Sequence, residues 1–260
     1  MRPHRWLRVL KTISAAMTVE YELPRDPAKG LRLFAEDVAF TPDNPNALST
    51  EGNEIGEFLA MMKATYPQHY AITLLGFAIG HRPSTLRPLR RKGRMADLLF
   101  HDDGTARLIV RRSNSRGQEI MESTKTRAVV VVELPKEVAD VLKEHIAELD
   151  KTALTRRSDL LFPSRITGEI QSKSALQKPF NNVAKGLGLK KRITPKSMRR
   201  TFKDLARAAG VEAVVRKAVS GHATDRMDQH YSTAGAGEKR AAVAAVVSIA
   251  TARAKRASEG

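Results

Sequence analysis

The feature that most constrains the fold of this chain is an apolar segment, HYAITLLGFAIG, at residues 69–80. Its apolar side chains fall on almost every side of a helical wheel, which is typical of a helix buried in a core. Gly80 ends the segment, and the charged stretch HRPSTLRPLRR follows it directly. The sequence therefore predicts a central helix that delivers His81 and Arg82 at its carboxyl end, followed by a second, short helix.

The other patterns predict a mainly α-helical domain with a small antiparallel β-sheet, the α+β class. Two runs at 106–112 and 126–134 are rich in strand-forming residues and predict a β-hairpin that carries Lys125. Apolar residues at helical spacing, with capping and breaking residues at the ends, predict the remaining helices. They are expected at about 50–66, 134–149, 172–188, 195–209, 211–220, 224–231 and 237–256.

The N-terminal residues are expected to form a separate part of the chain. Residues 5–22 place apolar side chains at helical spacing, whereas residues 35–50 hold two prolines and are typical of a linker. One helix and a linker do not make a domain, so we expect the end of a truncated preceding domain. The predicted organisation is residues 1–47 for this helix and linker, 48–235 for the main domain, and 236–260 for a C-terminal helix.

The positive charge of the chain is concentrated in two segments. The net charge is +17, yet residues 1–81 contribute −1 and residues 128–180 contribute 0. Residues 82–127 hold 12 Lys or Arg against 5 Asp or Glu, and residues 181–260 hold 17 against 6. A merely solubilising surface is the alternative, but so sharp an asymmetry favours a polyanion partner, most simply nucleic acid.

Composition excludes several other classes of protein. No uninterrupted apolar run approaches the length of a membrane span, and the basic N-terminus lacks the apolar core of a secretory signal. The chain has no Cys, which excludes disulfides and thiolate metal sites and fits a reducing compartment. We therefore expect no membrane partner and a cytoplasmic location.

A set of residues in the two basic segments has the chemistry of phosphoryl transfer. Its members are Arg82, Lys125, Lys196, Arg199, His222 and Tyr231. Arg side chains donate to two phosphate oxygens at once, and fixed positive charge stabilises a pentacovalent transition state. Surrounding cations help a Tyr to attack as a phenolate, and a Lys on a hairpin can protonate the leaving oxygen. No carboxylate cluster for Mg²⁺ is evident in the sequence, so the expected mechanism uses no metal and no other cofactor.

The order and context of these residues resemble the catalytic domain of the tyrosine recombinases, the phage integrase family. GHRPSTLRPLR resembles the segment around the first catalytic Arg of the family, and STKTR resembles its hairpin lysine motif. TPKSMRRTF resembles the His–x–x–Arg box, and SGHATDRMDQHYS resembles the last box, which holds a His and the nucleophilic Tyr. The resemblance covers roughly residues 48–235. In this family a core-binding domain precedes the catalytic domain, and residues 5–22 would be its last helix.

The chain departs from the family pattern at three points. Thr85 stands where an acidic residue is usual, three positions after the first Arg. Lys196 stands where His is usual, a substitution shared with the related type IB topoisomerases. The interval of 43 positions from Arg82 to Lys125 is long, which leaves Lys92 as a weaker alternative for the general acid.

The resemblance implies a role for each residue of the set. Tyr231 would attack a DNA phosphodiester and form a 3′-phosphotyrosyl link, releasing a 5′-hydroxyl without ATP. Arg82, Arg199, His222 and Lys196 would bind the scissile phosphate. Lys125 would protonate the departing oxygen.

The resemblance also implies partners. Double-stranded DNA is the expected substrate, bound by a homotetramer that is a monomer in isolation, in a bacterial host. The C-terminal helix could dock on a neighbouring subunit or pack on its own domain. Two other functions stay open at this point, a type IB topoisomerase-like DNA relaxing enzyme and a degenerate domain that binds DNA without cutting it.

Overall fold

The computed structural model of the chain describes residues 3–31, 46–49, 53–114, 129–221, 240–248 and 251. The chain divides into two units, residues 1–43 and 44–260. Among the predicted elements, the helix at 224–231 and the hairpin tip with Lys125 lie outside the described residues.

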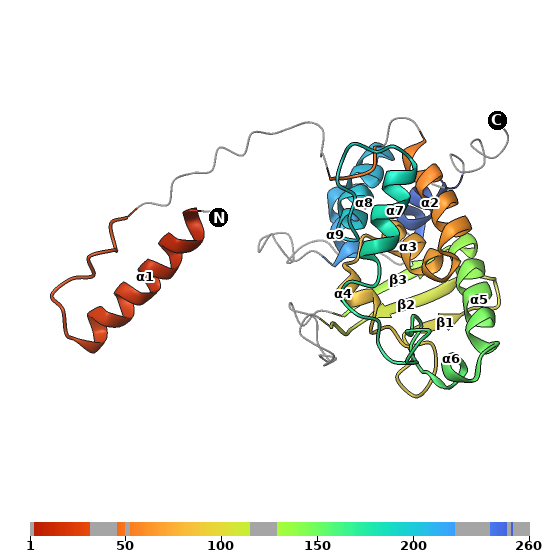
Figure 1. The fold of residues 1–260 in the computed structure, drawn as a ribbon, viewed down its shortest axis with the longest axis horizontal. Coiled ribbons are helices and arrows are strands. Elements are labelled where there is room, and N and C mark those ends of the chain that lie inside the picture. Colours follow the sequence, from red (N-terminus) through yellow and green to blue (C-terminus); the bar gives the residue numbers. More distant parts are fainter. Residues whose placement is uncertain are drawn as a thin grey trace. The chain divides into compact units, whose positions relative to one another are not determined.

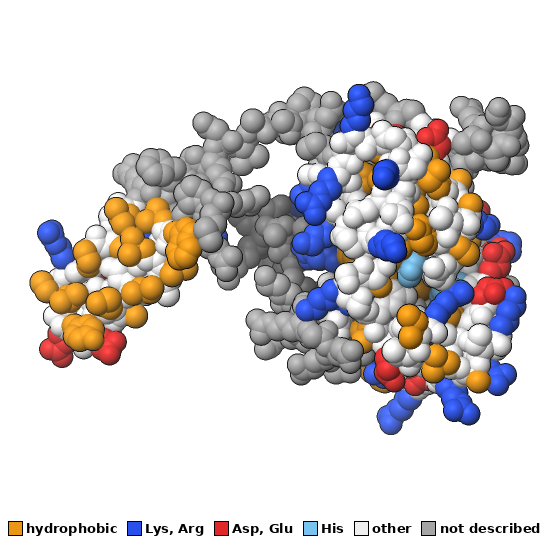
Figure 2. Space-filling model, in the orientation of Figure 1, with side chains coloured by type: hydrophobic (Ala, Val, Ile, Leu, Met, Phe, Trp, Pro, Cys, Tyr) orange, Lys and Arg blue, Asp and Glu red, His pale blue; other side chains and the backbone are white. Residues whose placement is uncertain are grey.

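The first unit contains one long helix, α1 (Pro3–Glu20), as the apolar spacing of residues 5–22 predicts. A stripe of large apolar side chains runs along it, and these side chains stay 47–58% exposed (Figure 2). The stripe consists of Trp6, Leu10, Ile13 and Met17. No helix of the described chain is both long and apolar enough to cross a lipid bilayer, α1 included.

The second unit is mainly helical with one small antiparallel sheet, which confirms the predicted class (Figure 1). Its elements in chain order are α2 (Glu54–Thr65), α3 (Pro67–Ile79), α4 (Pro83–Leu86), β1 (Leu98–Phe100), β2 (Ala106–Val110), β3 (Val130–Leu134), α5 (Lys136–Asp150), α6 (Ala153–Arg157), α7 (Gln177–Gly186), α8 (Ser197–Ala208) and α9 (Ala213–Ser220).

Helix α3 is the centre of this unit, as its apolar sequence predicts. Residues 71–79 are all buried, and the helix packs against α2, α4, α5 and α8. An aromatic cluster joins α3 to α2 and α7: the ring of Phe58 lies 6.0 Å from that of Phe77 and 5.1 Å from that of Phe180. Burying such side chains contributes about 1.5–3 kcal/mol each, so this cluster fixes the helical layer on which the site is built.

Two glycines on α3 and at its end let α8 approach closely. A Cβ at Gly76 would lie 2.3 Å from Sδ of Met198, and a Cβ at Gly80 would lie 2.4 Å from Cδ1 of Phe202. Gly76 and Gly80 are four residues apart, so both face the same side of α3. Met198 and Phe202 are also four residues apart, and their side chains fill the space that the two glycines leave. This packing sets the position of α8 relative to the α3–α4 turn.

The sheet has the order β1-β2-β3, with both pairs antiparallel. Leu108 pairs with Leu98 on one side and with Val132 on the other. The β2–β3 pair is the predicted hairpin, whereas β1 and α6 were not predicted. With three and five residues respectively, each is shorter than the window over which hydrophobic periodicity can be recognised.

The C-terminal helix packs on its own domain where the structure describes it. Residues 240–248 are helical. Ala242, Val243, Val246 and Val247 are at most 3% exposed and belong to the same hydrophobic core as α3 and α8. Docking of this helix on a neighbouring subunit stays a prediction.

Candidate active site

The first residue of the site, Arg82, lies in the turn between α3 and α4. Gly80 takes a left-handed conformation with φ +66°, which ends α3 and turns the chain. Arg82 is the N-cap of α4 in extended conformation, and Pro83 begins that helix. The side chain of Arg82 is exposed, so it is available to a ligand.

Arg199 on α8 lies beside this turn. Its Nη1 donates to the carbonyl oxygen of Gly80 at 3.3 Å, although the two residues are 119 positions apart in the chain. Burial, and secondly the charge of Arg82, lower the pKa of Arg199 to about 10, so the guanidinium is still charged at neutral pH. The structure therefore brings together the two Arg residues that the sequence analysis paired.

The arrangement follows from the two faces of α8. Met198, Phe202 and Leu205 are buried in the core, at positions i, i+4 and i+7. Arg199 is partly buried at the edge of this face, next to the glycine that receives Phe202. The close approach of α3 and α8 thus places the Arg199 segment beside the turn that carries Arg82.

Lys196 is placed at the amino end of the same helix. It is the N-cap residue of α8 and is exposed. The preceding turn is held by the hydroxyl of Ser197, which accepts a hydrogen bond from the main-chain N of Thr194 at 3.0 Å. Lys196 therefore lies one helical turn from Arg199, as its spacing predicts.

His81 is a residue of the site to which the sequence analysis gave no role. It is 4% exposed, and its Nε2 lies 3.0 Å from the carbonyl oxygen of Val219 at the end of α9. Because a carbonyl can only accept, Nε2 carries the proton. Burial first, and then the charge of Arg199, lower the pKa of His81 to about 4. A neutral imidazole thus ties the α3–α4 turn to the residue two positions before Gly221, where the described segment ends.

Thr85 holds the main chain of the same turn. Its hydroxyl donates to the carbonyl oxygen of Arg82 at 2.9 Å and lies 3.4 Å from Nδ1 of His81. The hydroxyl fixes the backbone of Arg82, a role that an acidic side chain, which can only accept when ionised, could not perform.

Arg87, one turn after Arg82, has a structural role. It is 4% exposed, and its guanidinium donates to the carbonyl oxygens of Gln171 at 2.8 Å and Asn114 at 2.7 Å. The main-chain N of Asn114 in turn donates to the carbonyl oxygen of Ser84 at 2.7 Å. These bonds attach Asn114 to α4. Asn114 is the last described residue before the segment that contains Lys125.

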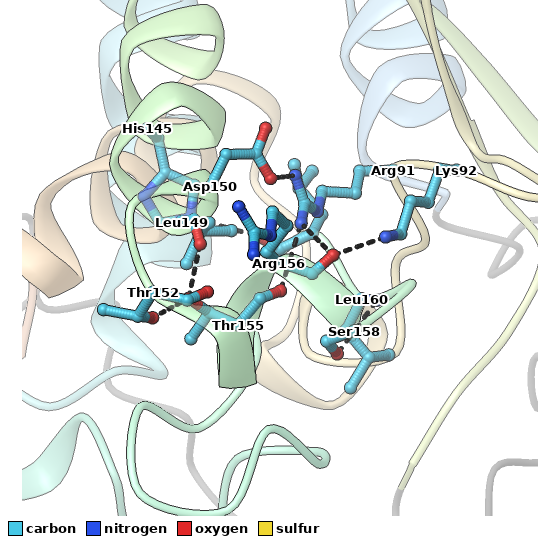
Figure 3. A network of polar contacts seen from close by, with 11 residues as sticks. Arg91, Lys92, His145, Leu149, Asp150, Thr152, Thr155, Arg156, Ser158 and Leu160 are labelled. Atoms are coloured by element: carbon cyan, nitrogen blue, oxygen red, sulfur yellow. Dashed lines mark hydrogen bonds and ion pairs between the residues drawn. The ribbon is translucent and has the colours of Figure 1, made fainter.

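Lys92, the weaker alternative to Lys125, takes part in a different network (Figure 3). Its Nζ donates to the carbonyl oxygen of Arg156 on α6 at 2.5 Å. Arg91 beside it pairs with Asp150 at the end of α5, with 2.8 Å between Nη1 and Oδ1. A cavity of about 740 Å³ lies near this network and is lined by α6 and residues 158–160 and 167–170, together with Arg90. These contacts join α5 and α6 to the 90–92 segment and give Lys92 a place in the fold.

Three residues of the predicted set lie outside the described residues: Lys125, His222 and Tyr231. Their roles therefore stay predictions. The described residue that directly precedes His222 is Gly221, which caps α9 with φ +65°. A Cβ at this position would lie 3.3 Å from Cε1 of His81, so the chain enters the His222 segment directly beside the imidazole.

A family model described as the phage integrase family matches residues 49–237, which is more than half of the chain. The chain belongs to the phage integrase family. This assignment confirms the resemblance and identifies the protein as a tyrosine recombinase.

Solved structures of recombinases share the fold. The Tn1549 transposon integrase in complex with a circular intermediate DNA matches with a TM-score of 0.65 and 19% identity, over 99% of this chain and 78% of that one. The XerA recombinase matches with a TM-score of 0.51 and 18% identity, over 92% and 81%.

A third match is the XerH site-specific recombinase bound to its difH substrate, with a TM-score of 0.50 and 18% identity. It covers 68% of this chain, which spans about half, 48%, of the XerH chain. No curated protein sequence matches this chain.

Proposed function

We propose that this tyrosine recombinase cleaves and rejoins double-stranded DNA at specific sites through a 3′-phosphotyrosyl link to Tyr231. The observation that carries the proposal is that Arg199 bonds to the α3–α4 turn at Gly80, two residues before Arg82, and that the charge of Arg82 lowers the pKa of Arg199. The two guanidiniums can donate to the non-bridging oxygens of one phosphate and stabilise the charge of a pentacovalent transition state. The bond to Gly80 positions Arg199, and the bond from Thr85 positions the main chain of Arg82, so part of this geometry is set before a phosphate binds.

The other residues of the set complete the proposed reaction. The phenolate oxygen of Tyr231, with its proton released to water, would form a bond to phosphorus while the bond to the 5′-oxygen breaks, and Lys125 would give that oxygen its proton. His222 would donate to the phosphate from the segment that begins beside His81. The phosphotyrosyl link keeps the energy of the broken diester. A 5′-hydroxyl can therefore attack this link and rejoin the DNA without ATP.

Lys196 would act as a phosphate donor in place of the usual His. An ammonium at the N-cap of α8 adds positive charge beside Arg199 and the amino end of the helix. It cannot act as the neutral base that His would provide. Lys196 is the one observation that favours the topoisomerase-like alternative.

The proposed assembly is a homotetramer on two DNA sites, formed in the cytoplasm from monomers. In the described residues the C-terminal helix is packed in cis. During assembly this helix would either stay on its own domain or move to a neighbouring subunit. Cross-linking of the tetramer through a cysteine introduced at an exposed position of 240–248 distinguishes the two arrangements.

Covalent capture tests the proposed function. Duplexes of random sequence with a nick near the centre release the fragment beyond the cleavage point and trap the covalent intermediate. We expect a protein–DNA adduct with the wild type, enriched for a particular sequence, and none with Tyr231→Phe. The absence of any adduct indicates a domain that only binds DNA. Adducts without sequence preference, together with relaxation of supercoiled plasmid by the monomer, indicate the topoisomerase-like enzyme.

A further inference from the structure

Helix α8 carries a row of cations that begins at the edge of its buried face, at Arg199, and continues along its exposed side. Lys196, Arg199, Lys203 and Arg207 follow one another at i, i+3, i+7 and i+11, which places them on one side of a helix with 3.6 residues per turn. Lys203 and Arg207 are exposed. Figure 2 shows Lys and Arg side chains along the edge of the unit where Figure 1 places α8 and α9.

Lys203 lies among the charges of the candidate active site. Burial lowers its pKa first, and the charges of Arg199, Arg82 and Arg216 lower it further. Asp204 is the acidic group that opposes this effect, but its carboxylate also lies 3.9 Å from Arg207. The charges of three cations from three elements, the α4 N-cap, α8 and α9, therefore all act on the Lys203 ammonium. Such a cluster is electrostatically unfavourable until an anion is bound to it.

The spacing along α8 indicates which anion this is. Arg199 and Lys203 are four residues apart, which corresponds to about 6 Å along the helix axis. Adjacent phosphates of one DNA strand rise by about 3.4 Å along the duplex axis and are also rotated around it, so their separation is of the same order. If Arg199 binds one phosphate of a DNA strand, Lys203 therefore lies at the spacing of a neighbouring phosphate.

We propose that Lys203 is a binding residue for the DNA phosphate next to the scissile one, on the same strand. This inference rests on the proposed function, which places the scissile phosphate at Arg82 and Arg199. The contact would hold the cleaved strand at two adjacent phosphates and so orient its backbone around the scissile one. Direct contact with a phosphate carries no sequence information by itself, so the contribution is to affinity and positioning.

The first experiment measures binding of the full chain to a 30-base-pair duplex of random sequence at several salt concentrations. We expect Lys203→Ala to lower the affinity about tenfold at low salt and to reduce the slope of log K against log salt by about 1. Lys203→Arg should retain both. Lys143→Ala removes the same charge from α5, at the opposite edge of the unit in Figure 1, and serves as the matched control with an unchanged slope. A Lys203→Ala slope equal to that of the wild type overturns the inference.

The second experiment identifies the phosphate. The duplex captured by the wild type is synthesised with an uncharged methylphosphonate at one or the other phosphate flanking the cleavage point. At one of these two positions we expect wild type and Lys203→Ala to bind with equal affinity, because the partner of Lys203 has lost its charge. If the difference between the two proteins persists at both positions, Lys203 does not bind a neighbouring phosphate.

The two proposals fail in different ways. If the wild type forms no covalent adduct, the proposed function fails, and the salt slope still shows whether Lys203 binds a DNA phosphate. If the wild type forms the adduct and Lys203→Ala changes only the cleavage rate of saturated DNA, the ammonium acts on the scissile phosphate itself and the inference is wrong.

Discussion

The buried imidazole of His81 makes a quantitative prediction about acid stability. Burial lowers the pKa of His81 to about 4, against an ordinary value of about 6.5. The unfolded chain therefore binds a proton between these pH values and the folded chain does not, so the stability falls as the pH falls. Each pH unit in this window corresponds to about 1.4 kcal/mol, so lowering the pH from 6.5 to 5 should cost about 2 kcal/mol through His81 alone.

His81→Gln isolates this contribution. The Gln amide can still donate to the carbonyl oxygen of Val219 but does not titrate, so the variant should lose about 2 kcal/mol less stability than the wild type between pH 7 and pH 5. Burial also lowers the pKa of His145 to about 4. A residual pH dependence should therefore remain in His81→Gln, and it should decrease by a similar amount when His145 is also replaced; the lowered pKa of His69 keeps part of it.

Urea unfolding at a series of pH values measures this difference. Far-UV circular dichroism is the appropriate signal, because the single Trp of the chain, Trp6, lies on α1 in the other unit and is 58% exposed. Equal pH dependence in wild type and His81→Gln would contradict the assignment of a neutral, buried imidazole. A wild-type stability that is constant from pH 7 to pH 5 would contradict it for both histidines.

Two further predictions concern the core around the site. Gly80→Ala should destabilise the protein by about 2–5 kcal/mol, since it adds left-handed strain and a Cβ that would lie 2.4 Å from Cδ1 of Phe202. Gly210→Ala has a similar φ of +70° with nothing within 4 Å, so it should cost only about 1–2 kcal/mol; equal costs in thermal unfolding would show that close packing is not the cause. Asp97→Asn should cost about 3–5 kcal/mol, because Asp97 is fully buried and pairs at 2.6 Å with the buried guanidinium of Arg112. A loss below about 1 kcal/mol in urea unfolding would refute the role of this ion pair.

The sequence by itself identified the parts of the site that depend on local pattern. The apolar run of α3 predicts burial wherever the helix lies, because every side of it is apolar. The spacing of Lys196 and Arg199 predicts one helix face, and the motifs around Arg82 and Tyr231 indicated the family that the comparison confirmed. Each of these inferences depends on residues within a few positions of one another.

Only the tertiary structure decided how these parts combine. The separation of Arg82 and Arg199 depends on the packing of α8 against Gly76 and Gly80, which no local pattern records. The hydrogen bond from His81 to Val219 joins residues 138 positions apart, and a single histidine in the sequence does not predict such a bond. Lys203 looks in sequence like one more cation of a solvated helix face, and its neighbours from α4 and α9 become evident only in the fold. Charge and hydrophobic periodicity can be read from the sequence. The electrostatic potential at a bound phosphate depends on distances between cations, and the packing of distant segments sets these distances.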